Sequence, residues 1–391
     1  MADTQYVKSV KVVEPKDGVA QVAERNMRQP WLIAANQMSE NVSINGEAVN
    51  PAYIPEVDMF SSAVIKKGVV KGWGQVVWIK IDKTGQAVSE PCFFDDKTRR
   101  IGGTFHKSLN RAIIRKDFAV KISDNDFYAY CDKGTPMVVV PLMKLDMGLA
   151  PTYTPAGAAV YNGKTGELKN HKDIKRGDVI GPIYSKWLSR KVIDSTASTD
   201  GFWSWLWAAT GYGAYGGENS SELVLGDKTD DSASFITPLT MIGRGKAITA
   251  VGQQDASAIE YGKLNKYIIA KLPTPRQGNN AVQDRIKADH AGLEWATGMK
   301  IFEIVPNGPE RWTATLGQNK SVMYTLTINP DSSSCLHSVR GEKLRCTNDK
   351  EDVVDVEVSK SDDPLNLAKM SNAELLKLQE SVHDEVAKRL K

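Results

Sequence analysis

The stretch Phe202-Trp-Ser-Trp-Leu-Trp-Ala-Ala-Thr-Gly-Tyr-Gly-Ala-Tyr-Gly-Gly217 is the most unusual part of the chain, because it holds three of the nine tryptophans within five residues. Trp203, Trp205 and Trp207 alternate with other residues, so in an extended strand all three indoles point to one face. A helix would spread the same rings around its axis, and the glycines that follow disfavour a helix interior. The pattern therefore predicts a β-strand.

A row of indoles on one face of a strand is either buried or in contact with a partner. We expect this Trp ladder (Trp203, Trp205 and Trp207) to lie in a core, as a strand or as a loop that covers a sheet. A surface for a glycan or for another subunit is the alternative. The stretch does not fit a membrane span, because Asp200 and Glu218 bracket a run shorter than the roughly 20 apolar residues that a bilayer needs.

Strand-like patterns continue on both sides of the Trp ladder. The sequence predicts strands within Met59–Ile81, Met137–Met143, Ile236–Val251, Met299–Val305, Arg311–Leu316 and Ser321–Ile328. Ala158–Leu168 is typical of a hairpin, and Arg176–Tyr184 of a turn followed by a strand. Helices are expected at Ser257–Leu272 and Asn280–Thr297. Together these patterns predict a mainly β chain with a few helices (α+β), built from several sandwich-like or barrel-like units.

The two prolines Pro151 and Pro155 indicate a domain boundary, because prolines so close together disfavour both a helix and a central strand. At 391 residues the chain is long enough for several domains with their own cores. We expect a β-rich N-terminal domain at 1–150 and a β-rich middle domain with the Trp ladder at 151–256. A mixed α+β region follows at 257–348, and an acidic linker with a C-terminal helix at 349–391.

The end of the chain predicts an amphipathic helix. Ser371 is a candidate N-cap, and Glu374 three residues later completes a capping box. The apolar stripe of this helix consists of Leu375, Leu378, Val382, Val386 and Leu390. Such a helix docks on its own chain or pairs with another subunit, and we expect docking on its own chain.

Charge is distributed unevenly along the chain, although the net charge is only +3. The segment Lys97–Lys121 holds eight Lys and Arg residues against one acid, with Arg111, Arg115 and Lys116 close together near its end. Asp349–Asp363 holds seven acids against two lysines. The basic segment is expected to be a solvated face. Contact with the acidic segment of another subunit is the second interpretation, and nucleic acid is the least favoured.

No motif in the sequence indicates catalysis. The glycines at 211, 213 and 216 match a dinucleotide fingerprint, but no helix is expected to follow them, so a nucleotide site is not expected. Asp289 and His290 are neighbours on an expected helix and point in different directions, which argues against a metal site. Cys335 and His337 show no third group that would complete a nucleophilic site. We therefore expect no catalytic residue, no cofactor and no metal.

Three further features have simple interpretations. Asp124 and Asp126 begin like a calcium loop, but aromatic residues stand where oxygen ligands are needed, so we interpret them as turn acids. Arg176-Gly-Asp178 is interpreted as a turn and not as an adhesion tripeptide. The four cysteines show no metal-binding spacing and the N-terminus shows no signal pattern, which indicates folding in a reducing cytoplasm.

A many-stranded chain with opposite charge segments and a terminal helix fits a self-assembling structural protein. The segments Tyr153–Leu168 and Arg176–Gly181 resemble the short hairpins of head and decoration proteins of tailed bacteriophages. The resemblance implies a non-enzymatic virion component of head, decoration or neck type. It would be made in the host cytoplasm, without a membrane anchor, and would contact its own copies and other structural subunits. A carbohydrate-binding module around the Trp ladder is the alternative, followed by a glycan-active enzyme of β-sandwich or barrel type.

Replacing Ser371 by Ala removes the side chain that caps the predicted C-terminal helix. We expect the free energy of opening this helix to fall by about 1 kcal/mol, because a backbone N–H at the helix start loses its acceptor. Hydrogen–deuterium exchange over residues 372–390 of the full chain measures the change. Ser381→Ala, in the middle of the same helix, is the matched control and should not lower protection. Equal protection in Ser371→Ala and the unaltered chain would contradict the predicted cap.

Overall fold

The structure is a computed structural model. It describes residues 5–14, 46–66, 73–81, 87–89, 91–95, 98–123, 126–147, 151–196, 211–214, 223–226, 231–242, 247–307, 311–318, 321–329, 333–338 and 341–348. The chain divides into two compact units, residues 1–347 and 348–391. All described helices and strands belong to the first unit.

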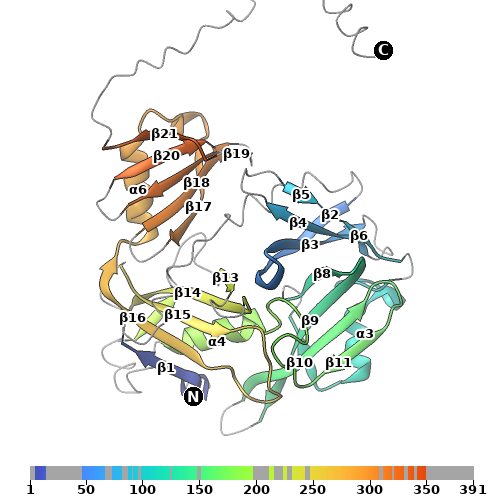
Figure 1. Cartoon of the computed structure of the whole chain (residues 1–391). Helices are drawn as coiled ribbons and strands as arrows, with labels where there is room; N and C mark the ends of the chain where they lie inside the picture. The colour runs from blue at the N-terminus through green and yellow to red at the C-terminus, as the bar shows by residue number, and fades with distance from the viewer. Residues whose placement is uncertain are drawn as a thin grey trace, which may run out of the picture. The chain divides into compact units, whose positions relative to one another are not determined.

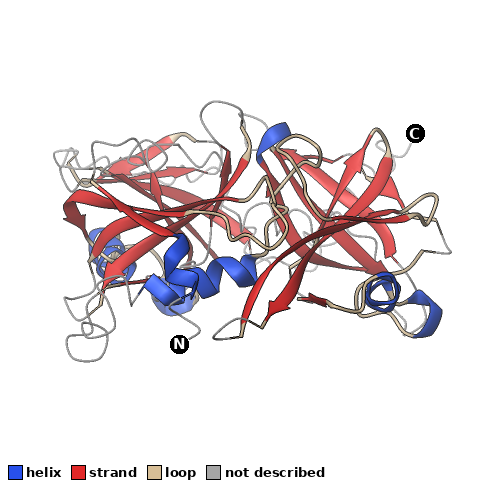
Figure 2. Cartoon of the chain, turned by 90° about the horizontal axis from the view of Figure 1, so that it is seen from below, coloured by secondary structure: helices blue, strands red, loops and turns tan. Residues whose placement is uncertain are grey.

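The first unit is mainly β, as the sequence predicts, and contains four small sheets arranged like the blades of a four-bladed propeller (Figure 1). Sheet I consists of β2 (Gly46–Ile54), β3 (Met59–Lys66), β4 (Trp73–Ile81), β5 (Ala87–Ser89) and β6 (Cys92–Phe93). Sheet II consists of β7 (Val120–Ile122), β8 (Tyr128–Asp132), β9 (Thr135–Asp146), β10 (Thr152–Asn162) and β11 (Leu168–His171). Strands account for most of the secondary structure in the described chain (Figure 2).

The other two sheets are formed mainly by the second half of the chain. Sheet III consists of β1 (Val10–Val13), β12 (Tyr212–Ala214), β13 (Leu223–Gly226), β14 (Ala233–Met241), β15 (Ile248–Asp255) and β16 (Tyr267–Arg276). Sheet IV consists of β17 (Lys300–Asn307), β18 (Arg311–Gln318), β19 (Ser321–Ile328), β20 (Ser334–Ser338) and β21 (Lys343–Cys346). The described α-helices are α3 (Leu109–Lys116), α4 (Lys186–Ser195) and α6 (Asn279–Asp289).

Strand pairing is antiparallel throughout the described sheets, with one exception. The N-terminal strand β1 pairs parallel to β16, with Val10 opposite Tyr267 and Val13 opposite Ala270. An ion pair between Glu14 and Lys271 (2.8 Å) lies just beyond the end of this pairing. The start of the chain is thus joined to a strand more than 250 residues later.

Strand β9 is apolar at successive positions and is buried on both faces. Val139 and Met143 belong to a core shared with α4 and with strands of sheets I and III. Val138, Val140 and Leu142 point to the opposite face, into a core shared with α3 and sheet I. The predicted buried strand at Met137–Met143 is therefore confirmed, and β9 separates two cores.

Strand β10 contradicts the expectation that Pro151 and Pro155 exclude a central strand. It lies between β9 and β11 and runs through Pro155. Proline is tolerated there because the register with β9 shifts between Pro155 and Gly157, so the missing N–H falls at an irregularity of the ladder. The carbonyl of Pro155 instead accepts a hydrogen bond from the N–H of Gly262 (2.8 Å). The predicted hairpin at Ala158–Leu168 is confirmed by the pairing of β10 with β11.

The helix expected at Ser257–Leu272 is wrong. Ser257 donates from both its N–H and its Oγ to Asp255 Oδ1, and such local side-chain bonds compete with a helix. Gly262 has a positive φ of 76°, and β16 begins at Tyr267. The helix expected at Asn280–Thr297 is confirmed for its first part as α6, and a 3₁₀ helix covers Trp295–Thr297.

In Arg176–Tyr184 the predicted turn is present and the predicted strand is not. Gly177 has a φ of 89°, and the N–H of Asp178 donates to the carbonyl of Lys175 (3.1 Å). Beyond an isolated bridge at Val179, the chain is irregular, because Gly181 also has a positive φ of 91°. Tyr184, whose side chain is buried, is followed by Ser185, the N-cap of α4.

Two disulfides connect strands that the sequence gives no sign of pairing. Cys92 of β6 is bonded to Cys131 of β8, which links sheet I to sheet II. Cys335 of β20 is bonded to Cys346 of β21, directly opposite in the register. No cysteine in the described chain is left as a free thiol, which does not fit the expectation of folding in a reducing cytoplasm, where disulfides are rare.

Gly157→Ala is expected to be among the most damaging small substitutions in sheet II. Gly157 has a φ of 96°, and an added Cβ would lie 1.8 Å from the carbonyl oxygen of His171. Backbone strain and the clash together should lower the free energy of unfolding by about 3–5 kcal/mol, measured by chemical denaturation.

Gly166→Ala is the matched control for this substitution. Gly166 also has a positive φ, 73°, but the nearest atom to its added Cβ is Tyr161 Oη at 3.9 Å. It should cost about 1–2 kcal/mol, from backbone strain alone. Equal losses of unfolding free energy at the two positions would show that the close approach of β10 to β11 does not cause the loss in Gly157→Ala.

Candidate functional site

The structure shows where one group of the predicted contact residues lies. Arg111, Arg115 and Lys116 are all in α3. The other predicted contact residues, and the acidic segment, lie outside the described residues: Trp203, Trp205, Trp207, Leu375, Leu378, Val382 and Asp349–Asp363. The site is therefore built from the basic segment around α3.

Helix α3 is capped at its start and anchored on one side. Ser108 precedes it, and its Oγ accepts a hydrogen bond from the backbone N–H of Arg111 (3.2 Å). Leu109 and Ile113, about one helical turn apart, are fully buried in the core that covers one face of β9. Because the inner face is fixed by these contacts, the opposite face of α3 is left to solvent.

The outer face of α3 combines two guanidinium groups with apolar side chains. Arg111 and Arg115 are exposed, and 43% of the surface of Ile114 is accessible. Phe118, just after the helix, is 92% accessible. We call Arg111, Ile114, Arg115 and Phe118 the basic α3 surface. Arginine and exposed aromatic side chains together are typical of surfaces that contact a partner.

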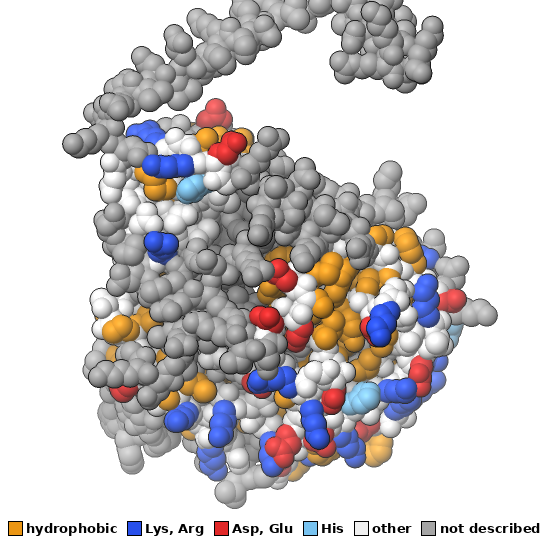
Figure 3. Space-filling model, viewed as in Figure 1, with side chains coloured by type: hydrophobic (Ala, Val, Ile, Leu, Met, Phe, Trp, Pro, Cys, Tyr) orange, Lys and Arg blue, Asp and Glu red, His pale blue; other side chains and the backbone are white. Residues whose placement is uncertain are grey.

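Lys116 has a different role from its two neighbours. Its Nζ donates a hydrogen bond to the backbone oxygen of Leu168 in β11, so it fixes α3 to sheet II. Arg111 and Arg115 form no ion pair with any other residue that the structure describes. In Figure 3, Lys and Arg side chains lie along the lower edge of the face in view, over parts of sheets III and II, with Asp and Glu side chains among them. The two arginines can therefore bind an external anion without breaking an internal pair.

A buried polar cluster joins the end of α6 to β20. Ser334 Oγ donates to Asp289 Oδ2 (3.0 Å) and lies 3.0 Å from His290 Nε2. Arg285 Nε donates to the same oxygen of Asp289 (3.3 Å). Ser334 is fully buried and His290 is nearly so. A serine, a histidine and an aspartate within reach of one another are also the parts of a hydrolytic triad.

The direction of the hydrogen bonds distinguishes this cluster from a triad. In a triad the histidine accepts the serine proton, and the aspartate holds the far nitrogen of the imidazole. Here the single proton of Ser334 is directed to Asp289, so the hydrogen-bond network assigns His290 Nε2 as a donor to Ser334 Oγ. The imidazole therefore does not act as a base toward the hydroxyl. The cluster is a buried clamp that fixes the end of α6 on sheet IV.

Sequence reasoning missed this convergence because it placed Asp289 and His290 inside one helix. The structure ends α6 at Asp289, and His290 has the non-helical angles φ −120° and ψ 44°. This change of backbone direction allows both side chains to reach Ser334. Cys335 and His337, the other pair considered, do not form a nucleophilic site, because Cys335 is held in a disulfide.

The predicted turn acid Asp126 also caps a helix. Its backbone N–H donates to the carbonyl of Ser123 (3.1 Å), and the other predicted turn acid, Asp124, lies outside the described residues. Its carboxylate accepts hydrogen bonds from the N–H groups of Lys186 (2.8 Å) and Trp187 (3.2 Å) and from Ser185 Oγ at the start of α4. Burial raises the pKa of this carboxyl group, although the hydrogen bonds lower it. The partner helix begins about 60 residues later, so local sequence gives no sign of the contact.

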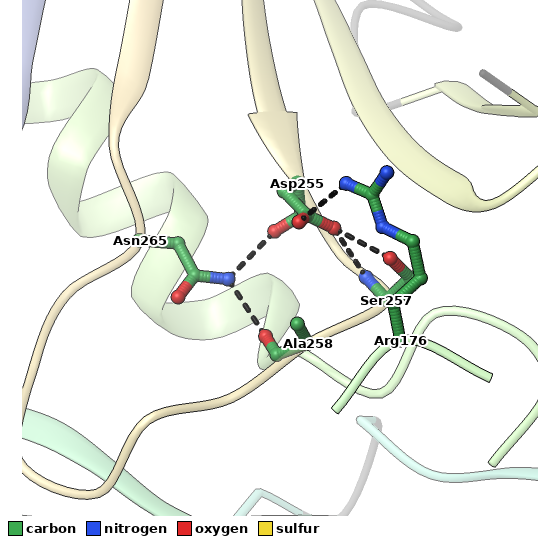
Figure 4. A network of polar contacts seen from close by, with 5 residues as sticks. All are labelled: Arg176, Asp255, Ser257, Ala258 and Asn265. Carbon is green, nitrogen blue, oxygen red and sulfur yellow. Dashed lines mark hydrogen bonds and ion pairs between the residues drawn. The ribbon is translucent and has the colours of Figure 1, made fainter. Parts of the chain in front are cut away.

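Arg176 and Asp255 form the centre of an exposed polar network (Figure 4). Arg176 Nη2 lies 3.0 Å from Asp255 Oδ2, and Ser257 donates to Asp255 Oδ1. Asn265 Nδ2 donates to the backbone oxygens of Asp255 and Ala258, both at 2.8 Å. The network closes the irregular loop after β15. Arg176 is therefore occupied within its own chain, which agrees with its interpretation as a turn residue.

Comparison with known proteins adds no relative to this description. No family model, curated protein or solved structure matches the chain. Within the described ranges, no group of three or more His, Cys, Asp or Glu side chains is placed to hold a metal ion. No helix in the described part of the chain is long and apolar enough to cross a bilayer.

The buried clamp at the end of α6 should make stability depend on pH. Burial lowers the pKa of His290 below its ordinary value of 6.5, with a further lowering by Arg345 and an opposing effect of Asp289. The unfolded chain therefore takes up this proton at a higher pH than the folded chain. The free energy of unfolding should be constant above about pH 7 and should fall as the pH drops below about 6.5.

Denaturation at a series of pH values tests this expectation. His290→Gln should remove most of the decrease between about pH 7 and pH 5, because its amide can donate to Ser334 without titrating in this range. His171→Gln, an exposed position at the end of β11, is the matched control and should keep the decrease. An unchanged pH profile in His290→Gln would contradict the assignment.

Proposed function

We propose that this chain is a non-enzymatic structural protein that assembles with its own copies and with other structural subunits. In this proposal it is a component of a virus particle of the tailed-bacteriophage type, made in the host cytoplasm. The observation that carries the proposal is the basic α3 surface. Two arginines without an ion pair in the described chain flank an exposed Ile114 and a nearly fully exposed Phe118, on a helix anchored in the core.

The proposed occupant of the basic α3 surface is the acidic segment Asp349–Asp363 of a neighbouring copy. Its seven acids oppose the basic segment in charge. Its central part, Val353-Val-Asp-Val-Glu-Val358, alternates apolar and acidic residues, which suits a surface that alternates Arg with Ile and Phe. Every copy of the chain supplies both surfaces, so the contact is head-to-tail and can extend through many copies.

The energetic basis of this contact is burial of the phenyl ring together with pairing of the guanidinium groups. Arg and aromatic side chains are enriched among the residues that dominate binding energy at interfaces. The ion pairs by themselves contribute little at an exposed rim, since solvent screens them. Burial of Phe118 against valine side chains supplies the larger share. The acids of the segment determine which partner is selected.

Two structural features fit this proposal. The described chain is mainly β, and the proposal extends this to sandwich-like or barrel-like units followed by a terminal amphipathic helix. The two disulfides fit a virus particle, because disulfides persist on virions and are rare in a reducing cytoplasm.

Reversal of the charge on α3 tests the proposed contact. Arg111→Glu together with Arg115→Glu should abolish association between copies, measured by native mass spectrometry and sedimentation velocity at low salt. Association of the unaltered chain should weaken as salt rises above about 0.1 M, where the screening length falls below about 10 Å. Phe118→Ser should weaken association at every salt concentration, because the apolar part of the contact is not screened.

A matched control and a rescue make this test specific. Lys133→Glu with Lys164→Glu changes the net charge equally at exposed turn positions and should leave association intact. Asp355→Lys with Glu357→Lys in a second chain should restore binding to the Arg111→Glu, Arg115→Glu chain. A chain that stays monomeric at low salt and high concentration would overturn the proposal of self-assembly. Assembly that survives the charge reversal would overturn this particular contact.

A further inference from the structure

We propose that Lys121, Tyr153, Trp187 and Lys191 form a binding site for adjacent phosphates of a nucleic-acid strand. We call these four residues the lysine–indole cluster. The proposal does not depend on self-assembly, because it uses none of the residues of the basic α3 surface.

Three elements bring the cluster together. Lys121 lies in β7, opposite Met143 of β9, and Tyr153 lies in β10, opposite Leu145 of β9. Positions 143 and 145 are two residues apart on one strand, so Lys121 and Tyr153 share a face of sheet II. Helix α4 adds Trp187 and, one turn later, Lys191.

The geometry of the cluster places two ammonium groups around one indole. Lys121 Nζ lies 4.3 Å from the centroid of the Tyr153 ring and 4.7 Å from that of Trp187. Lys191 Nζ lies 5.5 Å from the centroid of Trp187. The two rings meet edge to face, with centroids 5.2 Å apart and an angle of 89° between their planes. Cation–π contacts of this kind orient the lysines without neutralising their charge.

The aromatic pair is held in place by backbone hydrogen bonds to buried groups. The N–H of Tyr153 donates to Tyr6 Oη at 2.9 Å. The N–H of Trp187 donates to Asp126 Oδ2 at 3.2 Å, at the capped start of α4. Leu188 and Val192 on the inner face of α4 are fully buried. The rings are therefore a rigid support for the flexible lysine stems, which reduces the entropy lost on binding.

The charges around the cluster leave an excess of positive charge. Lys121 forms no ion pair with the rest of the described chain. Lys191 has one acidic partner, Asp194, at 3.9 Å, and the two side chains are 44% and 67% exposed, so solvent screening makes this pair weak. The carboxylate of Asp126 is buried and already accepts hydrogen bonds from the start of α4. Lys186 at the start of α4 adds further positive charge.

A second lysine–aromatic group on the opposite face of the same sheet end provides a comparison. Lys144 Nζ lies 3.9 Å and Lys172 Nζ 5.3 Å from the centroid of the Tyr261 ring. There, however, the carboxylate of Asp173 accepts the N–H of Tyr261 (2.8 Å), while Glu260 is already paired with Lys263. The negative charge of Asp173 beside this ring reduces the attraction for an anion. An anion is therefore expected to favour the lysine–indole cluster.

The chemistry of the cluster fits a phosphodiester chain. Lysine ammonium groups bind phosphate oxygens as compact point charges, and two of them around one ring can contact successive phosphates of one strand. Aromatic side chains beside a basic surface are the combination that single-strand-binding proteins use. An acidic peptide would gain the charge attraction but nothing from the aromatic rings beyond apolar contact. A phosphodiester strand is therefore the proposed ligand, bound by the two lysines that the aromatic rings support.

Fluorescence anisotropy with a labelled oligothymidylate of about 15 nucleotides tests the site on the full-length chain. Lys121→Gln with Lys191→Gln should weaken binding about 25-fold at 0.1 M salt, because two phosphate contacts are lost. The slope of log K against log salt should become shallower by about 1.4 for the same reason. Circular dichroism checks that the variant is folded.

Lys144→Gln with Lys172→Gln is the matched control, because it removes the same charge from the same kind of ring contact. This control should bind the strand within about twofold of the unaltered chain. Equal losses in the two double variants, or no loss in either, would overturn the site. If pyrophosphate competes as well as the unlabelled strand at the same phosphate concentration, the ligand of the site is a small phosphate compound and not a strand. Tighter binding of a peptide with the sequence of residues 349–363 would replace it by an acidic segment, and either result would overturn the proposal.

Discussion

Strand β9 supplies side chains to two cores, because the run Met137-Val-Val-Val-Pro-Leu-Met143 is apolar at successive positions. Each large apolar side chain buried there contributes about 1.5–3 kcal/mol, so both faces of the strand favour burial. The same composition does not specify register, since a slip by one residue would still place apolar groups on both faces. The register is specified by the turn before β9 and by the bulge in its partner strand β10. Lys133 and Gly134 both have positive φ, as a two-residue hairpin from β8 requires, and the shift at Gly157 fixes β10.

The sequence predicts much of the strand content of the described chain, because period-two patterns and short apolar runs are local signals. The strands of sheet IV at Arg311–Gln318 and Ser321–Ile328 lie where their patterns place them. The failures depend on hydrogen bonds and strand irregularities that form only in the folded chain. Residues 257–266 have a helix-like composition, but Asp255 and Asn265 bind the loop backbone across several residues. Pro155 is accommodated in a central strand only because β10 has a bulge at that position. Neither cause is visible in a window of the sequence.

The candidate surfaces also differ in how much of each could be predicted from the sequence. The basic α3 surface could be found from sequence, because its arginines lie within one charged segment and its apolar residues are interleaved with them. The lysine–indole cluster could not be found, since Lys121, Tyr153 and Trp187 meet only after sheet II and α4 have formed. The clamp of His290 and Ser334 was missed for a further reason. It depends on one residue after α6 that leaves the helical conformation, and a helix boundary is uncertain by about one or two residues in sequence.

The structural clusters of this protein differ from the surfaces that are available to a ligand in one respect. In the structural clusters, the polar and charged groups already have partners within the chain. At Ser334 every proton has an acceptor within the cluster, so an approaching substrate would have to break a buried bond that is costly to lose. Arg176 is likewise occupied by Asp255, although both side chains are partly exposed. Lys121 and Arg115 are different, because their charges contact aromatic rings or water and no described carboxylate. Binding an anion there removes no existing pair. Resemblance to a catalytic triad is therefore weaker evidence of function in this chain than unneutralised charge on a rigid support.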